Sequence, residues 1–297
     1  VELEDCRKVA FATSSNSFWC QLDPQTGTAN SAALALRNLV STGATPLFIA
    51  DCLNVGNPER PESYAEFVEA AKGLGRFSHD FDIPVVTGNV SPYNERIVDG
   101  VSNRIKPTSQ VLLGGVLPRD RPPIRRTLCT PWANIYLIGE TYRELNGTEF
   151  QRYQLQESRG LPPEYQPQSE KRAMDAVLKT QKQGLVRSCN NVGRGGLSIA
   201  LMKMVMKSEY GFTLDLRDIP GTAGSITEAL YSESSARYLM EVTESNQEAF
   251  LRIVRESGAA ATELGLTVNE RIANFGEFSL SIEAARESFK RGLAQQL

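Results

Sequence analysis

The sequence predicts an α+β fold built from two domains, residues 1–120 and 129–297. Short apolar runs typical of buried strands alternate with segments of helical periodicity on both sides of a boundary. That boundary is the proline-rich stretch Pro118–Pro123, which lies between strand-like runs at 110–116 and 134–138. A chain of 297 residues is long enough to form two separate cores.

Two helices are expected between the strands of the first domain. The first covers roughly residues 29–41 and ends before Gly43, because glycine commonly follows a helix C-terminus. The second begins near Pro61 and carries an apolar face at helical spacing, which indicates packing rather than ligand binding. The residues of this face are Tyr64, Phe67, Val68, Ala71, Leu74 and Phe77.

Helices and strands are mixed again in the second domain. The expected elements are helices over 169–182, over 197–204 after Gly195-Gly196, and over 246–257, and strands over 212–216 and 237–242. The helix over 246–257 has the clearest ends, because Ser245 and Glu248 match a capping box and Gly258 follows as a stop. The proline-rich residues 161–167 are expected to form a surface loop.

Composition is ordinary for a globular protein, with 41% hydrophobic and 23% charged residues. The net charge of −3 does not favour nucleic-acid binding, and no apolar run reaches the roughly 18 residues of a membrane helix. No secretory signal is recognisable at the start of the sequence. Five scattered cysteines argue against a disulfide framework or a zinc site, so we expect a cytoplasmic protein. They are Cys6, Cys20, Cys52, Cys129 and Cys189.

Two segments carry most of the functional information, Asp51–Pro58 and Val85–Glu95. Each follows a short apolar run, so we expect buried strands that deliver loops to one end of a sheet. Glycine lets a backbone approach a ligand closely, while Asp and Asn oxygens suit a hard cation or a sugar hydroxyl. The pattern predicts a site for a nucleotide and its metal, where the side chains of Asp51 and Asn89 converge on one pocket.

Other catalytic patterns find little support in this sequence. The single histidine, His79, has no evident nucleophile partner, so a surface or packing role is the simpler interpretation. Walker A and dinucleotide-binding fingerprints are absent from the sequence. Residues 191–196 match a glycine-rich phosphate loop only loosely, which by itself is a weak indication.

A series of further motifs occurs in an order that resembles the phosphoribosylformylglycinamidine synthase family, in the C-terminal half of the synthetase part. Gly88–Glu95, read as Gly-Asn-Val-Ser-Pro-Tyr-Asn-Glu, is the most specific of them. The others are Leu22–Pro24, Arg37–Asn38, Gly43–Ala44, Asp51–Pro58, Gly139–Thr141, Gly195–Leu197 and Ser232–Ser234. The resemblance runs nearly from one end of the chain to the other.

The resemblance implies a PurM-like fold. In such a fold the N-terminal α/β domain contributes strands to a barrel shared between two units, and a C-terminal α/β sandwich domain follows. The implied activity is that of an ATP-dependent ligase of purine biosynthesis. It converts formylglycinamide ribonucleotide, ATP and ammonia to the amidine through an iminophosphate, with Mg²⁺ neutralising phosphate charge. A glutaminase domain or subunit is the implied ammonia source.

Four residues of this chain match functional positions of the family. Asp51 and Gly88 match positions that contact ATP, Asn89 matches a Mg²⁺ ligand, and Ser91 matches a substrate contact. For each residue taken singly, ordinary turn chemistry is the alternative interpretation. No catalytic residue is assigned, because the family's catalytic histidine belongs to the preceding half.

The sequence departs from the family pattern in the second domain. The family signature His-Asp-Val-Ser-Asp-Gly-Gly-Leu is replaced by Asn190–Leu197, so its carboxylates are missing and Arg194 stands in place of an acid. Residues 12–16 also lack a usual aspartate. Fewer carboxylates mean less negative charge for Mg²⁺.

Two other interpretations therefore stay open. The chain could be a non-catalytic PurM-like assembly module with a degenerate nucleotide site, or another ATP-using enzyme of the superfamily. A lone half leaves barrel strands unpaired, so we expect a homodimer or a complex with an N-terminal half.

Overall fold

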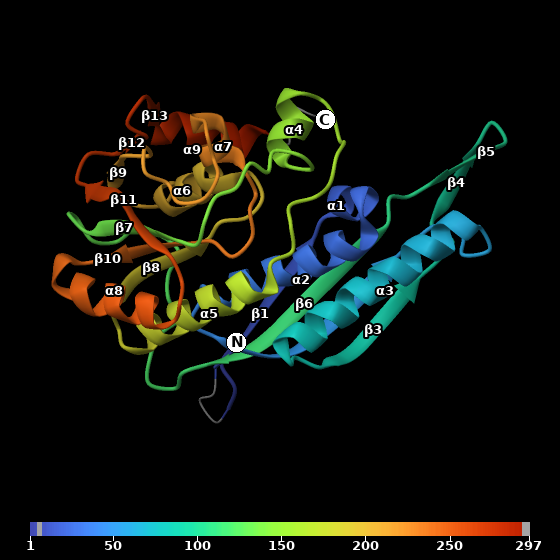
Figure 1. The fold of residues 1–297 in the computed structure, drawn as a ribbon, viewed down its shortest axis with the longest axis horizontal. Helices are drawn as coiled ribbons and strands as arrows, with labels where there is room; N and C mark the ends of the chain where they lie inside the picture. The colour runs from blue at the N-terminus through green and yellow to red at the C-terminus, as the bar shows by residue number, and fades with distance from the viewer. Residues whose placement is uncertain (5–7, 293–297) are drawn as a thin grey trace. The chain divides into compact units, whose positions relative to one another are not determined.

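The computed structural model describes residues 1–4 and 8–292, and these form two compact units. The first unit comprises Val1–Val40, Ala44–Pro122 and Glu144–Lys171, and the second comprises Ser41–Gly43, Pro123–Arg143 and Arg172–Leu297. Both units combine helices with a sheet, so the predicted α+β class is confirmed (Figure 1). Residues 144–171 follow the boundary expected at 120–129, yet they pack within the first unit.

The first unit is built on a four-stranded sheet with the order β1-β6-β2-β3. Its strands are β1 (Lys8–Ser15), β2 (Thr45–Asn54), β3 (Val85–Ser91) and β6 (Thr108–Leu117). Only the β2–β3 pair is parallel, and β3 is an edge strand. A separate hairpin, β4 (Glu95–Val98) and β5 (Val101–Arg104), follows β3.

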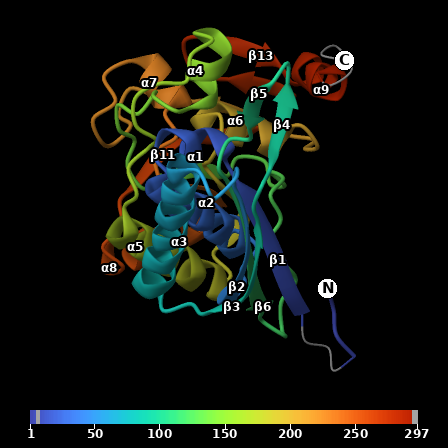
Figure 2. The ribbon, with the colours of Figure 1, turned by 90° about the vertical axis from the view of Figure 1, so that its right-hand side faces the viewer.

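Helices cover one face of this sheet. They are α2 (Pro24–Val40) and α3 (Pro61–Phe81), with the short α1 (Ser17–Leu22) preceding α2 (Figure 2). On the covered face Ile49 and Leu53 of β2 and Leu113 of β6 are buried. On the other face, the ring of Phe48 lies over Gly114 and Phe11 remains 53% exposed. The open face therefore carries apolar side chains with little cover.

The proline-rich residues 161–167 do not form the expected surface loop. Pro162, Pro163 and Tyr165 are buried, and the side-chain amide of Asn30 in α2 donates to the Pro163 carbonyl at 2.5 Å. The buried ion pair between Arg37 and Glu170 also ties this part of the chain to α2. Proline composition alone does not report such long-range contacts, so the prediction was wrong. The helices α4 (Glu149–Gln154) and α5 (Pro167–Lys182) flank the segment.

The second unit contains a seven-stranded sheet with the order β13-β12-β9-β11-β7-β10-β8. The strands are β7 (Asn134–Ile138), β8 (Val186–Asn191), β9 (Gly211–Leu214), β10 (Tyr238–Val242), β11 (Ala261–Val268), β12 (Ile272–Asn274) and β13 (Ser279–Ser281). The helices that follow α5 are α6 (Gly196–Val205), α7 (Ile226–Tyr231), α8 (Gln247–Glu256) and α9 (Ile282–Arg291). The core lies between the strands and α6, where Leu197, Leu201 and Met204 are buried.

The N-terminus of α8 corrects one sequence prediction. Its N-cap is Asn246, which makes no side-chain capping hydrogen bond, and Ser245 lies in a 3₁₀ turn, η1 (Glu244–Asn246). The Ser245 hydroxyl instead lies 3.1 Å from the Thr243 hydroxyl. The expected capping box is therefore absent, because the extra turn moves the helix start by one residue. The expected stop is present at Gly258, where φ is +68°.

Three further expectations concern membrane helices, the cysteines and the single histidine. No helix within residues 1–4 and 8–292 is long and apolar enough to cross a membrane. Cys20, Cys52, Cys129 and Cys189 are free thiols, while Cys6 lies outside the described residues. His79 is exposed near the end of α3, which agrees with a surface role.

Candidate functional site

The two segments singled out in the sequence lie on neighbouring strands. β2 and β3 pair in parallel, with Asp51 opposite Gly88, Cys52 opposite Asn89, and Asn54 opposite Ser91. These residues were expected in loops, but main-chain pairing continues through them to the ends of both strands. Polar residues at a sheet end were taken as loop residues, so the predicted loop positions were wrong and the predicted adjacency was right.

Asp51 and Gly88 share the helix-covered face of the sheet. Asp51 lies between the buried Ile49 and Leu53 on β2, and side chains two apart on a strand point the same way. A Cβ atom at Gly88 would lie 2.4 Å from Oδ1 of Asp51, so the carboxylate occupies the space above the glycine. Burial raises the pKa of the Asp51 carboxyl above its usual range. A side chain at position 88 would therefore displace the Asp51 carboxylate from this position.

Asn89 lies on the opposite, open face of the same two strands. Its side-chain nitrogen is 3.3 Å from the sulfur of Cys52, the residue directly across the ladder. Oδ1 of Asn89 accepts no hydrogen bond from the described part of the chain, and the residue is exposed. Asn54 on this face donates to the carbonyls of Cys52 and Thr108, both at 3.1 Å. The side-chain oxygen Oδ1 of Asn89 is therefore available to a ligand.

The expectation that the side chains of Asp51 and Asn89 converge on one pocket is corrected by this register. Successive side chains of a strand point to opposite faces. The Asp51 carboxylate lies over Gly88 on the helix-covered face, and the Asn89 amide lies beside Cys52 on the open face. Because β3 is an edge strand whose residues 85–90 are exposed, a ligand can reach both faces only around that edge.

The chain segments that follow β2 and β3 are bonded to each other. The Ser91 carbonyl accepts hydrogen bonds from the side chain of Asn94 at 2.6 Å and from the backbone N–H of Val55 at 3.1 Å. Tyr93 has φ of +62° and donates its N–H to the Gly56 carbonyl at 3.1 Å. The Asn94 side chain thus holds the backbone of Ser91 in position. Asn94 belongs to the motif Gly88–Glu95, but the sequence did not suggest this role.

The donor set around Asn89 limits which metal arrangement is possible. No group of three or more His, Cys, Asp or Glu side chains suited to a metal ion occurs in the described part of the chain. Mg²⁺ is commonly held by one or two protein ligands together with substrate phosphates and water. The neutral amide oxygen of Asn89 fits such a site as a single protein ligand. The negative charge around the metal must then come from the nucleotide.

The segment Asn190–Leu197 of the second unit, which departs from the family signature, contains no carboxylate that could bind a metal ion. Asn190 is buried and donates its side-chain amide to the Ala200 carbonyl at 2.9 Å. The N–H of Gly195 donates to the buried Glu233 at 2.7 Å. Burial, together with the neighbouring guanidinium groups of Arg126 and Arg194, lowers the pKa of Lys203. This neighbourhood is cationic, which favours anions over a metal ion.

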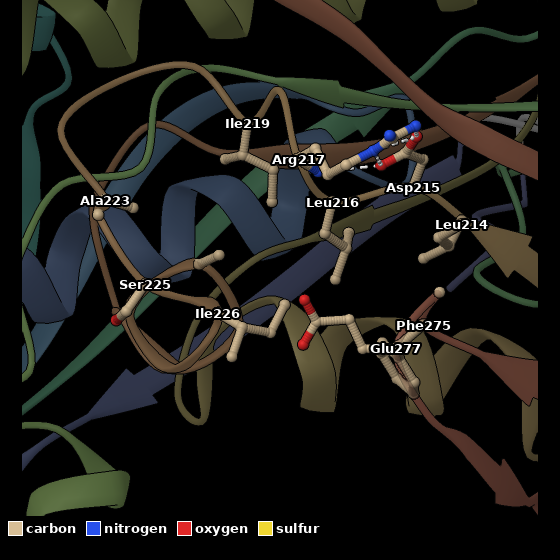
Figure 3. A pocket seen from close by; sticks show the side chains of 13 residues that line it. Leu214, Asp215, Leu216, Arg217, Ile219, Ala223, Ser225, Ile226, Phe275 and Glu277 are labelled. Atoms are coloured by element: carbon tan, nitrogen blue, oxygen red, sulfur yellow. Dashed lines mark hydrogen bonds and ion pairs between the residues drawn. The ribbon is translucent and has the colours of Figure 1, made fainter.

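Two buried charged residues of the second unit had no role assigned from the sequence, although one of them, Glu233, lies within the Ser232–Ser234 motif. Arg237 donates to the carbonyls of Ser232 and Ser234 at 2.6 and 3.0 Å, and Glu233 between them holds the glycine turn. The available signal was the run 232–237, where a glutamate and an arginine stand among small residues. A cavity of about 520 Å³ elsewhere in the second unit was also not predicted (Figure 3).

Comparison with known families assigns both parts of the chain. The model described as AIR synthase related protein, N-terminal domain, matches residues 1–115. The model described as AIR synthase related protein, C-terminal domain, matches residues 133–275.

Similar proteins are PurL subunits of phosphoribosylformylglycinamidine synthase. The subunit from Caldivirga maquilingensis is 39% identical over 260 residues, which are 86% of this chain and 35% of that protein. The subunit from Lacticaseibacillus paracasei is 35% identical over 295 residues, covering 97% of this chain and 37% of that protein. The chain spans little more than a third of the length of these relatives.

Solved structures share the fold. The structure of T. maritima PurL complexed with FGAR has a TM-score of 0.81 at 21% identity, covering 96% of this chain and 47% of that one. A chain of a HypE–HypF complex has a TM-score of 0.71 at 15% identity, covering 94% and 91%. The predicted sharing of a barrel between two units stays a prediction. Matched along both its parts, the chain belongs to the AIR synthase related family of the PurM-like superfamily, as a relative of PurL.

Proposed function

We propose that this chain supplies one half of the synthetase part of a phosphoribosylformylglycinamidine synthase, either within a longer protein or as a separate subunit. The observation that carries the proposal is the parallel pairing of β2 and β3, which aligns Asp51 with Gly88 and brings Asn89 and Ser91 alongside. These are the residues that match functional positions of the family. The reaction is an ATP-dependent C–N bond formation of purine biosynthesis, and we place it in the cytoplasm.

ATP is the proposed nucleotide at the β2–β3 edge. β3 is an exposed edge strand, so phosphate oxygens can approach the Gly88 backbone from solvent. Asp51 contacts the nucleotide from the helix-covered face, where its carboxyl accepts hydrogen bonds from base or ribose donors. The structure of T. maritima PurL complexed with ATP supports this choice of ligand for a relative.

Asn89 is the proposed Mg²⁺ ligand, through its side-chain oxygen. When bound, Mg²⁺ neutralises the charge that develops on the transferring phosphoryl group. The contact between the Asn89 amide nitrogen and the Cys52 sulfur turns the oxygen outward. A neutral oxygen adds no repulsion to a site already rich in phosphate charge.

Ser91 is the proposed contact to the substrate, formylglycinamide ribonucleotide. Its carbonyl is engaged by Asn94 and Val55, so its backbone position is set before any ligand arrives. ATP transfers its terminal phosphoryl group to the amide oxygen of the substrate, and ammonia then displaces phosphate to form the amidine. The residues of this chain bind and orient, while the groups that move protons are proposed to come from the other half. A glutaminase domain or subunit is the proposed ammonia source.

Calorimetry with ATP and Mg²⁺ tests this assignment on the wild-type chain, Asn89→Ala and Asn103→Ala. Asn103 is an exposed asparagine of β5 and provides a matched control. We expect Asn89→Ala to lose about tenfold in affinity for Mg²⁺·ATP, corresponding to the loss of one metal ligand. Asn103→Ala should bind like the wild type. Equal affinity of all three proteins would contradict the role of Asn89.

A second candidate is the non-catalytic assembly module, which the carboxylate-free turn at Asn190–Leu197 favours. In that case the chain binds neither ATP nor Mg²⁺·ATP, yet still associates with an N-terminal half. Sedimentation of the chain mixed with such a half, with and without nucleotide, separates the two candidates. Association that is indifferent to Mg²⁺·ATP, together with a flat calorimetric titration, selects the assembly module.

A further inference from the structure

A cavity of about 520 Å³ lies within the second unit, between the loop after β9, helix α7 and the turn that joins β12 to β13 (Figure 3). Its volume falls in the range that holds small organic ligands. None of Asp51, Gly88, Asn89 and Ser91 lines it, so it is separate from the proposed nucleotide site.

The walls of the cavity are mostly apolar. Leu216, Ile219 and Ile226 project into it, and Phe275 closes one side. Phe275 is 1% exposed and packs edge-on against Phe212, with ring centroids 5.1 Å apart. A wall of this kind is held in place by the core and offers apolar contact to the body of a ligand.

Most polar groups at the wall already have partners within the protein. Asp215 and Arg217 pair with each other, with Nε of Arg217 2.9 and 3.0 Å from the two carboxylate oxygens. The hydroxyl of Ser225 accepts the N–H of Glu228 at 3.2 Å, and the Gly224 N–H donates to the Glu228 carboxylate at 2.6 Å. The guanidinium of Arg217 is thus engaged, which disfavours an anionic ligand.

Glu277 is the exception among these groups. Its carboxylate points into the cavity between Leu216 and Ile226 and makes no hydrogen bond or ion pair with residues 1–4 and 8–292 (Figure 3). The turn that carries it is well defined, because Gly276 has φ of +87° and donates to the Asn274 side chain at 2.9 Å. A carboxylate beside apolar walls is complementary to a cation with an apolar body.

We propose that this cavity binds an organic cation, with an ammonium or guanidinium group on Glu277 and an apolar body against Leu216, Ile226 and Phe275. Two sources present this chemistry, a free small molecule and a Lys or Arg side chain of a partner protein. The proposal is independent of nucleotide binding at β2 and β3, so either can fail alone.

Methyl NMR on the chain labelled at isoleucine tests the proposal, because Ile219 and Ile226 line the cavity. The probe is 2-phenylethylammonium, compared with the neutral 2-phenylethanol and the anionic phenylacetate. We expect saturable shifts of the two isoleucine methyl signals with the ammonium, and about fivefold weaker binding of the alcohol. Raised salt should weaken binding of the ammonium only.

Substitutions at Glu277 test whether the charge of this residue, rather than the shape of the cavity, determines which ligand binds. Glu277→Gln should weaken ammonium binding about fivefold, to the level of the alcohol. Glu277→Lys should reverse the preference, so that phenylacetate binds instead. Glu256→Gln, on the exposed side of α8 and outside the cavity, is the matched control and should bind like the wild type. Glu277 is exposed, so neither change should affect folding.

The proposal is overturned if the ammonium leaves Ile219 and Ile226 unshifted, or if the alcohol binds as tightly as the ammonium. Unchanged ammonium binding by Glu277→Gln would overturn it equally. Nα-acetyl-lysine methylamide and Nα-acetyl-arginine methylamide then distinguish the sources. Tighter binding of a capped residue than of the free amine supports a partner side chain, and the reverse supports a free small molecule.

Discussion

Gly88 is determined by the side chain across the ladder. The Asp51 carboxylate fills the space where a Cβ atom at position 88 would lie, 2.4 Å from Oδ1. A sequence shows that a glycine is present near the end of a strand, but not which side chain lies over it. The register of β2 against β3 pairs these two residues.

Gly88→Ala should therefore disturb both stability and nucleotide binding. Crowding against Asp51 should cost about 1–3 kcal/mol of unfolding free energy. Gly75→Ala is the matched control, because Gly75 lies on α3 with open space around its missing Cβ. That control should gain about 0.5–1 kcal/mol from reduced backbone freedom. Urea denaturation measures both, and a Gly88→Ala chain as stable as the wild type would contradict the packing described here.

The stability of the chain should depend on pH through Asp51. Burial raises the folded-state pKa of this carboxyl above its ordinary value of 3.8, so the charged form is disfavoured in the folded protein. The resulting penalty is absent below the unfolded pKa and develops as pH rises through the folded pKa. Asp51→Asn should thus be more stable than the wild type near neutral pH, and the difference should shrink towards about pH 3. Denaturation at both pH values tests this, and a difference that grows on acidification would contradict it.

Cys52 should influence metal binding through Asn89. Its sulfur lies 3.3 Å from the Asn89 amide nitrogen, and that contact directs the amide oxygen away from the sheet. Cys52→Ala should lower the affinity for Mg²⁺·ATP about threefold, while Cys52→Ser retains an acceptor and should stay near the wild type. Calorimetry measures both variants. A Cys52→Ser chain weaker than Cys52→Ala would argue against positioning through this contact.

At the scale of elements, periodicity predicted what lies within a segment better than what lies between segments. The helix beginning at Pro61 and the strand at 134–138 form where the apolar pattern placed them. The strands β2 and β3 run further than predicted, because polar residues at their ends still pair along the backbone. The capping box failed because an extra 3₁₀ turn shifts the start of α8 by one residue, and the surface loop at 161–167 failed because its residues contact α2.

The candidate site was also predicted only in part from the sequence. The family motif identified Asp51, Gly88, Asn89 and Ser91, and the structure places them on adjacent strands. Which face each side chain occupies follows from strand alternation, and it could not be read while the segments were taken as loops. The cavity around Glu277 is formed by segments separated in sequence, so no local pattern indicated it.

The packing of α2 depends on a buried ion pair. The side chains of Arg37 and Glu170 are 2% and 0% exposed, and they join α2 to α5. Removing one partner leaves the other charge buried, so Glu170→Ala should cost about 3–5 kcal/mol of unfolding free energy. Glu69→Ala breaks an exposed pair with Lys72 and should cost no more than about 1 kcal/mol. Urea denaturation of the two variants compares them directly, and equal costs would contradict the importance of burial.

At the scale of the whole molecule, the sheet of the first unit has two edge strands and one face that no helix covers. Its edge strands are β1 and β3, and its open face carries Phe11, which is 53% exposed. Exposed apolar side chains and free strand edges favour association. The chain also spans little more than a third of the length of its PurL relatives.

The isolated chain should consequently form a dimer at micromolar concentration. Phe11→Lys should shift it to a monomer, because a charge on the open face is costly to bury. Tyr64→Lys is the matched control, since Tyr64 is 56% exposed on α3, away from that face. Sedimentation velocity gives the masses. A wild-type monomer, or dissociation by Tyr64→Lys instead, would contradict the expected interface.

The paired ends of β2 and β3 are the proposed site of a nucleotide and its metal. Replacing Mg²⁺ with paramagnetic Mn²⁺ in complex with ATP broadens NMR signals of nearby nuclei, which tests the claim directly. We expect broadening at Asp51, Gly88 and Asn89, including the Asn89 side-chain amide. Broadening centred on Arg194 and Gly195, or no broadening at these strand ends at saturating Mn²⁺·ATP, would contradict it.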